Sequence, residues 1–136
     1  MKTLGQPIVW VLHLAYLWLP VGFALKALVL LTGIAIAAFW LHALTVGALA
    51  TMILGMMTRV ALGHTGRPPV VYPVITVAYT LLSGAAVMRV FGLSLCGGSY
   101  LVVILIAASL WTTAFALFLW VYTPILVAPR ADGKAG

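Results

Sequence analysis

The sequence predicts an all-α fold, a multi-pass transmembrane helical bundle with about four spans. Hydrophobic residues make up 65% of the chain and charged residues only 6%, whereas a soluble chain carries about a quarter charged residues. Lipid must therefore be the solvent for most of the protein. The apolar runs are unbroken and close to the roughly 20 residues that a helical span requires, while barrel strands alternate polar and apolar residues. Both features favour helices.

The chain is expected to form one transmembrane domain of antiparallel helices with short connections. Its expected spans cover residues 7–30, 39–62, 70–89 and 100–122, and a polar tail follows at 130–136.

Proline and glycine set the expected boundaries of these spans. Pro7 suits a helix N-terminus, and Pro20 is expected to kink the first span. Gly63 is expected to end the second span in a left-handed cap. The glycines within 91–99 predict a tight turn, and Pro124 is expected to stop the last span. Four aromatic residues fit an interfacial belt: Trp10, Trp18, Trp120 and Tyr122.

The cations predict an orientation, because cytoplasmic loops carry an excess of Lys and Arg. With the N-terminus inside, two cations, Lys26 and Arg89, fall on the far side of the membrane. Five fall on the cytoplasmic side: Lys2, Arg59, Arg67, Arg130 and Lys134. We therefore expect both termini in the cytoplasm.

Several classes of function are excluded by composition. The net charge of +6 comes without a basic cluster or an aromatic stacking platform, so no nucleic-acid partner is expected. A single cysteine, Cys96, permits no internal disulfide and no cysteine metal cluster. The spans contain no carboxylate that could form a di-iron site. The sequence shows no recognisable pair of a nucleophile and a base, so hydrolysis is not predicted. A redox reaction remains an alternative function. A small transporter would require paired broken helices, and Pro20 is the one residue that indicates a broken helix.

Two stripes divide the second span on a helical wheel. Small residues recur every four positions on one side, where they admit either a neighbouring helix or a flat cofactor: Ala43, Gly47, Thr51 and Gly55. The other stripe carries His42, Thr45, Leu49, Met52, Met56 and Arg59.

Three histidines stand out in so apolar a chain, because ionisable residues within membranes are costly and commonly functional. Each is either a metal or haem ligand or a residue hydrogen-bonded to a neighbouring helix. His42 and His64 flank one span and lie about 30 Å apart at the helical rise, so they cannot share a metal within one chain. His13, at the depth expected for the cytoplasmic side, is the expected neighbour of His64.

Arg67 follows His64 in a loop with Gly66 and two prolines. Its guanidinium suits bidentate binding of a carboxylate, including a haem propionate. A positive anchor at the cytoplasmic surface explains the residue equally well.

Three sequence words carry a resemblance: HALTVG at 42–47, MTRV at 57–60 and LGHTGRP at 62–68. In these words, and in the segment 10–22, the chain resembles the NnrS family of membrane proteins. Family members are usually much longer, so the chain resembles their C-terminal third.

The resemblance implies haem and/or copper and a role in the bacterial nitric oxide response or denitrification, in the inner membrane. The resemblance implies that the cofactor is bound by the motif residues and, in addition, by His13 of the first span. The motif residues are His42, Thr45, Arg59, His64 and Arg67. The three histidines are the implied metal ligands. Missing ligands are expected from a homo-oligomer or from a partner membrane chain that supplies further spans. The alternative is a structural or assembly subunit that holds no cofactor.

Overall fold

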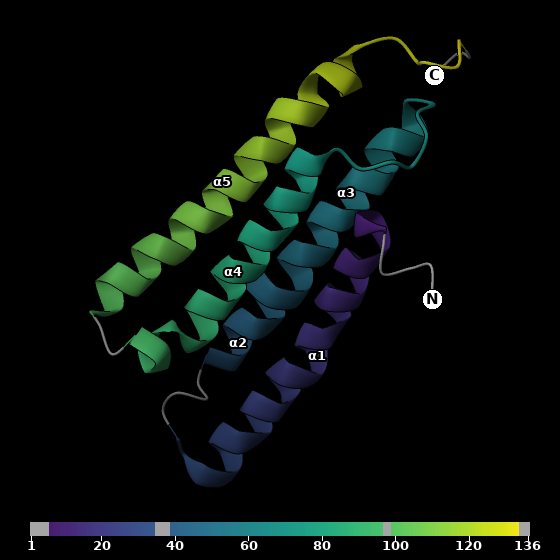
Figure 1. Cartoon of the computed structure of the whole chain (residues 1–136). Coiled ribbons are helices and arrows are strands. Elements are labelled where there is room, and N and C mark those ends of the chain that lie inside the picture. The colour runs from purple at the N-terminus through teal and green to yellow at the C-terminus, as the bar shows by residue number, and fades with distance from the viewer. Residues whose placement is uncertain (1–5, 35–38, 97–98, 134–136) are drawn as a thin grey trace.

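The structure, a computed structural model, describes residues 6–34, 39–96 and 99–133, and long helices dominate it (Figure 1). Helix α1 covers Pro7–Thr32, α4 covers Pro73–Cys96 and α5 covers Tyr100–Val127. The second span runs without a break through α2 (Trp40–His42), the π-helix η2 (Ala43–Ala50) and α3 (Thr51–His64). Four helical segments of the described chain are long and apolar enough to cross a membrane, and this confirms the predicted all-α, multi-pass fold.

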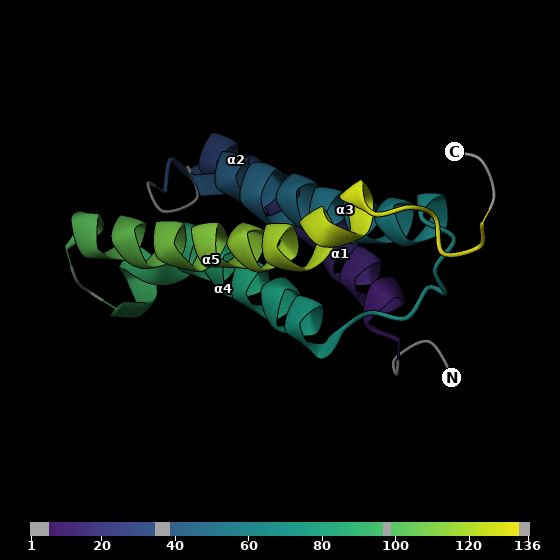
Figure 2. The ribbon, with the colours of Figure 1, turned by 90° about the horizontal axis from the view of Figure 1, so that it is seen from above.

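The helices form two antiparallel pairs. Helix α1 packs along α2, η2 and α3, and α4 packs along α5. The pairs join through contacts of α4 with η2 and of α3 with α4 and α5, so that α3 lies beside α5 in Figure 2. One hydrophobic core lies around Leu54, Tyr79 and Tyr122, and a second lies around Trp18, Ala86 and Val90.

The small-residue stripe of the second span faces α1. A Cβ atom built on Gly47 would lie 2.8 Å from Cε3 of Trp18 and closer to two other ring carbons. A Cβ atom on Gly55 would lie 3.0 Å from Cγ1 of Val11. Ala43 and Thr51, the other members of the stripe, are fully buried. The stripe therefore serves helix packing, because the missing side chains let the two helices approach closely.

The outer surface is apolar. Buried residues make up only 17% of the most apolar window of α1 and 22% of that of α5, against 39% for each of the two inner spans. Large side chains such as Leu31 and Trp120 point outward, with exposed fractions of 84% and 71%. A surface of this kind suits lipid or further helices.

Several boundaries differ from the expected ones. Helix α4 continues through Gly92 to Cys96, so the turn predicted at 91–99 is wrong for residues 91–96, and its part at 97–98 lies outside the described residues. Gly92 lies where α5 passes close by, since a Cβ atom there would be 2.8 Å from Cγ1 of Val103. Helix α5 continues past Pro124 to Val127, because a proline removes only the hydrogen bond of its own nitrogen and clashes with one carbonyl.

The predicted aromatic belt is also wrong in part. Trp120 is exposed, but Tyr122 is fully buried against Phe118 and Trp18 is buried against Gly47. These two rings therefore fill the cores of the bundle.

Candidate functional site

His64, the last residue of α3, is exposed and lines two grooves. One groove, of about 480 Å³, runs between Arg59 and Arg130 and includes Met56. The other, of about 280 Å³, passes Met57, Val60, Ala61, Phe118 and Leu126. The imidazole is thus open to a ligand on both sides of the helix end, with two guanidinium groups along the first groove.

The turn after His64 is a Schellman motif. The N–H of Gly66 donates to the carbonyl of Gly63 (3.2 Å), and the N–H of Arg67 donates to the carbonyl of Leu62 (2.9 Å). Gly66 has a left-handed backbone conformation, with φ of 67°. Gly33, which follows α1, has a φ of 69°. Glycines in this conformation commonly follow the ends of helices. The predicted cap at Gly63 is therefore wrong, because Gly63 is still helical and the chain turns three residues later.

The C-terminal tail packs onto this turn. The N–H of Ala131 donates to the carbonyl of Thr65 (2.9 Å), and the Asp132 carboxylate lies directly over Gly66. Arg130 donates to both oxygens of Asp132 (2.9 and 2.7 Å), and this hydrogen bonding raises the pKa of Arg130. The contact places Arg130 in the groove of His64, although the sequence assigned it only to the cationic side of the membrane.

Arg67 lines neither of these two grooves. It lines a separate cavity of about 370 Å³ with Leu62, Pro68 and Tyr72 among others. Its Nη1 atom is buried and has no hydrogen-bond partner among the described residues. A buried guanidinium nitrogen without a partner is costly, so this atom is suited to an anionic or carbonyl oxygen from outside the described residues.

His42 lies at the other end of the bundle, immediately before the π-helix. Its ring is half-buried and stacks on Phe39, with the ring centroids 6.1 Å apart. The guanidinium carbon of Arg89 in α4 lies 6.0 Å from the centroid of the same Phe39 ring. Thr45 donates its hydroxyl to the carbonyl of Leu41 (2.9 Å) inside the wider turn of η2. Helices of this type are frequent at functional sites.

His13 is exposed on α1, and its Nδ1 lies 3.0 Å from the carbonyl oxygen of Val9. Because Gly55 packs on Val11 and Leu12, the antiparallel register sets His13 level with residue 53. This level is roughly 16 Å from His64 along the helix axis. The expected pairing of His13 with His64 within one chain is therefore wrong, since α3 extends well beyond the start of α1 (Figure 1).

Apart from His13, the predicted site residues thus form two separate groups. His64 and Arg59 share a groove at one end, with Arg67 in the adjoining turn, whereas His42 and Thr45 belong to the other end. Within the described part of the chain, no three His, Cys, Asp or Glu residues converge as metal ligands would. Each end therefore presents a single imidazole.

These observations define an α-helical, multi-pass membrane protein with a histidine near each end of its second span. A protein-family model described as NnrS protein matches residues 1–130. The chain therefore belongs to the NnrS family. No curated protein and no solved structure matches it.

Proposed function

We propose that the protein binds haem and/or copper in the bacterial inner membrane and acts in the nitric oxide response or in denitrification. The observation that carries the proposal is the exposed imidazole of His64 in a groove with Arg59 and Arg130. Membership of the NnrS family supports it, since the resemblance of the motifs implies these cofactors.

The donor set fits a haem-like group in part. Imidazole is a common axial ligand of haem iron, and guanidinium groups bind carboxylates in a bidentate fashion. His64 would supply the imidazole, and Arg59 would supply the guanidinium that binds a carboxylate. The unpartnered Nη1 of Arg67 offers a further donor in the adjoining turn. Bound in this groove, haem would supply a redox-active iron that binds small diatomic molecules.

Copper fits this chain less completely. Copper sites use imidazole and thioether ligands, and Met56 lies in the groove of His64. One imidazole and one thioether leave the coordination incomplete. We therefore propose that a second copy of the chain or a partner membrane chain adds ligands, against the exposed apolar surface of α3 and α1.

His42 and Thr45 form the second proposed site, at the opposite end of the span. Since a helix cannot bring its own ends together, the cofactor content of this site is expected to be independent of His64. His13 presents its other ring nitrogen outward from α1 while Nδ1 meets a backbone carbonyl, an arrangement common in metal-binding histidines. It remains a proposed ligand toward a neighbouring chain.

Absorption spectra and metal analysis of the detergent-purified protein test this proposal. We expect a Soret band or bound copper in the wild type and a loss of at least half of it in His64→Ala. His64→Met keeps a ligand atom and is expected to shift the band rather than abolish it. The matched comparison is His42→Ala, which should reduce a separate fraction of the cofactor.

A colourless, metal-free protein purified from haem-replete cells would contradict the proposal. That result would favour the alternative, a structural or assembly subunit that holds no cofactor. Unchanged haem and copper in both His64→Ala and His42→Ala would contradict the site assignment alone.

A further inference from the structure

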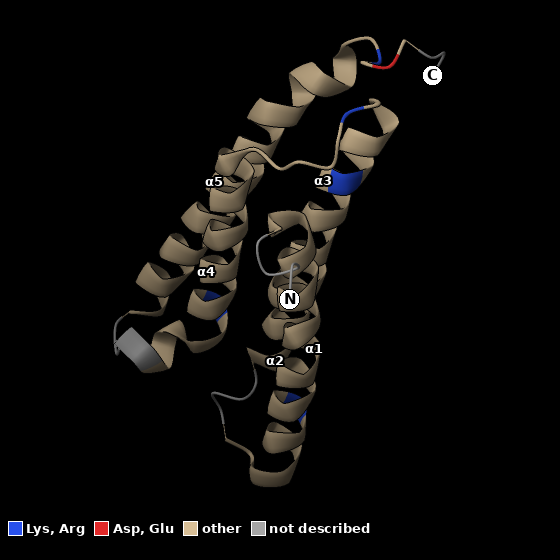
Figure 3. Cartoon of the chain, turned by 45° about the vertical axis from the view of Figure 1, so that its right-hand side comes forward, with Lys and Arg blue, Asp and Glu red and all other residues tan. Residues whose placement is uncertain are grey.

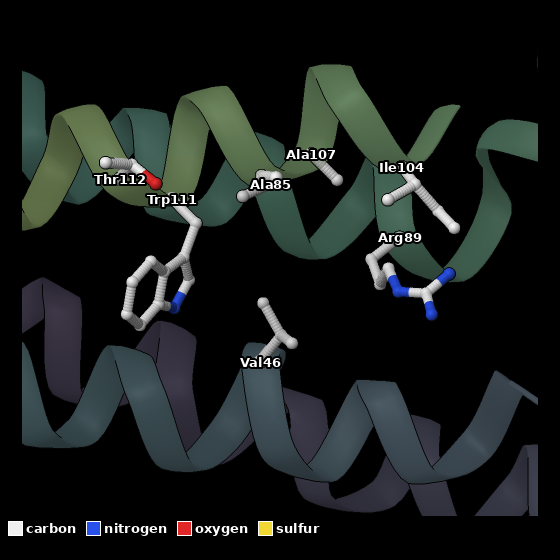
Figure 4. A pocket seen from close by; sticks show the side chains of 8 residues that line it. Val46, Ala85, Arg89, Ile104, Ala107, Trp111 and Thr112 are labelled. Atoms are coloured by element: carbon white, nitrogen blue, oxygen red, sulfur yellow. The ribbon is translucent and has the colours of Figure 1, made fainter. Parts of the chain in front are cut away.

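A cavity of about 280 Å³ lies between η2 and the α4–α5 pair, at the end of the bundle that holds His42 (Figure 4). In this view Trp111 of α5 extends toward η2 beside Val46, and the guanidinium of Arg89 of α4 lies on the other side of Val46 from the Trp111 ring. Much of the remaining wall consists of small or aliphatic side chains: Ala85, Ile104, Ala107 and Ala108. The cavity is therefore an apolar groove with a guanidinium at one side.

Arg89 carries a charge that the chain itself does not neutralise. The only acid in the sequence is Asp132, and it pairs with Arg130 at the opposite end of the bundle (Figure 3). Arg89 instead meets neutral groups, with both terminal nitrogens 3.4 Å from the hydroxyl of Tyr100. The rings of Phe39 and Tyr100 lie beneath its guanidinium carbon at 6.0 and 5.7 Å.

The depth of Arg89 limits what can neutralise it. It lies seven residues before the end of α4 at Cys96, which is roughly 10 Å along the helix axis. Cations within spans usually pair with another group or line a cavity, and those near helix ends reach toward the headgroup level. At this depth, a molecule that lies in the bilayer with its charged group near the headgroup level can supply the counter-ion.

We propose that this groove binds an anionic phospholipid, with the phosphate on Arg89 and an acyl chain against Trp111 and Ala107. Guanidinium groups bind phosphate oxygens in a bidentate fashion. Basic pockets between transmembrane helices bind anionic lipid headgroups. The alanines leave room along the wall for a methylene chain, which a soluble anion would not use. His42 does not line the cavity, but Phe39 lies against both its ring and Arg89, so the lipid site adjoins the proposed His42 site and lies far from that of His64.

Native mass spectrometry of the purified protein in detergent tests the proposal, with phosphatidylglycerol and phosphatidylcholine of equal chain length added in parallel. The wild type is expected to retain phosphatidylglycerol with a preference of roughly five-fold or more. Arg89→Gln should abolish the preference and Arg89→Lys should keep part of it. Ala107→Phe should reduce retention of both lipids, because the ring fills the groove.

Lys26→Gln is the matched control, since Lys26 is an exposed cation at the same end that lies over Trp40 rather than in the groove. Its preference should equal that of the wild type. Equal retention of the two lipids by the wild type, or an unchanged preference in Arg89→Gln, would overturn the proposal. Binding of inorganic phosphate alone, as tight as that of the lipid, would assign the site to a free anion and overturn it equally.

The experiment does not depend on a single variant or on the cofactor. If Arg89→Gln does not fold, Ala107→Phe tests the same groove from its apolar wall. The readout is the mass of retained lipid, so it does not depend on whether haem or copper is bound at His64.

Discussion

At the scale of single residues, Gly66 links the motif turn to the C-terminal tail. Its φ of 67° lies in the left-handed region, which side chains other than glycine adopt at a cost of roughly 1–2 kcal/mol. The Asp132 carboxylate also occupies the space into which a side chain would extend, with Cγ 2.6 Å from a Cβ atom built there. Backbone conformation and tail contact therefore both require a glycine.

The first prediction concerns this position. Gly66→Ala is expected to lower the free energy of unfolding by about 1–2 kcal/mol and to release the tail, measured by thermal unfolding in detergent. Gly63→Ala is the matched control, because Gly63 is helical with nothing within 4 Å of a built Cβ atom. Equal stabilities of the two variants would show that the turn does not depend on Gly66.

Tyr122 places a polar hydroxyl group in an apolar core. It is fully buried against Phe118, with ring centroids 4.7 Å apart. Its hydroxyl is buried without a hydrogen-bond partner among the described residues. The nearby hydroxyl of Thr58 donates to the carbonyl of Leu54 (2.9 Å). The ring therefore contributes packing, and the hydroxyl contributes little.

Accordingly, the second prediction is that Tyr122→Phe changes the free energy of unfolding by less than about 1 kcal/mol. Tyr122→Ala should cost about 3–5 kcal/mol, because it removes the ring from the core. Chemical unfolding in mixed micelles measures both. A loss well above 1 kcal/mol in Tyr122→Phe would reveal a hydrogen bond from Tyr122 to Thr58 and contradict this account.

At the scale of elements, the contact of α1 with the second span organises one half of the bundle. Gly47 receives the indole of Trp18, and Gly55 receives Val11. Gly22 of α1 likewise lies against Leu44. Close approach at three levels sets the antiparallel register and keeps His13 away from His64.

The third prediction follows from this packing. Replacing both Gly47 and Gly55 with leucine should separate α1 from the second span, because overpacking costs typically 1–3 kcal/mol at each site. Size-exclusion chromatography and thermal unfolding in detergent should show lost stability or a changed assembly. Gly63→Leu, which enters open space, serves as the control. A normally folded double variant would mean that the stripe is not a tight contact.

At the scale of the whole molecule, α1 begins and α5 finishes toward the same end of the bundle. The start of α1, the turn after His64 and the end of α5 lie together there (Figure 1). Arg59 lies near the end of α3, Arg67 in the turn that follows and Arg130 in the tail after α5, whereas Lys26 and Arg89 lie toward the opposite end, in α1 and α4. Figure 3 shows basic residues toward both ends of the bundle. Lys2 and Lys134, which strengthen the expected bias, lie outside the described residues.

The fourth prediction is that this common end is cytoplasmic, as the excess of cations indicates. Reporter fusions at the C-terminus and in the 64–69 loop should be active as cytoplasmic reporters. A fusion in the 34–39 connection should report the opposite side. Fusions with the reverse pattern would invert the orientation but leave the fold unchanged.

Much of the fold could be predicted because it depends on local properties. Long apolar runs dictate helices, since lipid offers no partner to the backbone. The recurrence of small residues every four positions, with Gly47 and Gly55 eight residues apart, indicates a face on which a neighbouring helix can pack. The family words at 42–47 and 62–68 likewise placed the chain among NnrS proteins by local sequence.

Other features depended on which side chains meet across helices. Trp18 and Tyr122 have the composition of interfacial anchors, and only their neighbours show them to be core residues. Arg130 reaches the groove of His64 because the tail folds back onto Thr65, a contact between segments far apart in sequence. His13 and His64 are separated by the register of α1 on α3, which no periodicity within one helix reveals.

The sequence by itself therefore determined the solvent of this protein, its helical class, its family and the presence of a histidine near each end of the second span. The tertiary structure alone decided which cation stands beside which histidine, which glycine turns the chain and where Arg89 meets an apolar groove. The physical reason is the range of the interactions. Burial in lipid and helix formation act along a short stretch of chain, whereas grooves and charge pairs arise only where separate helices pack together.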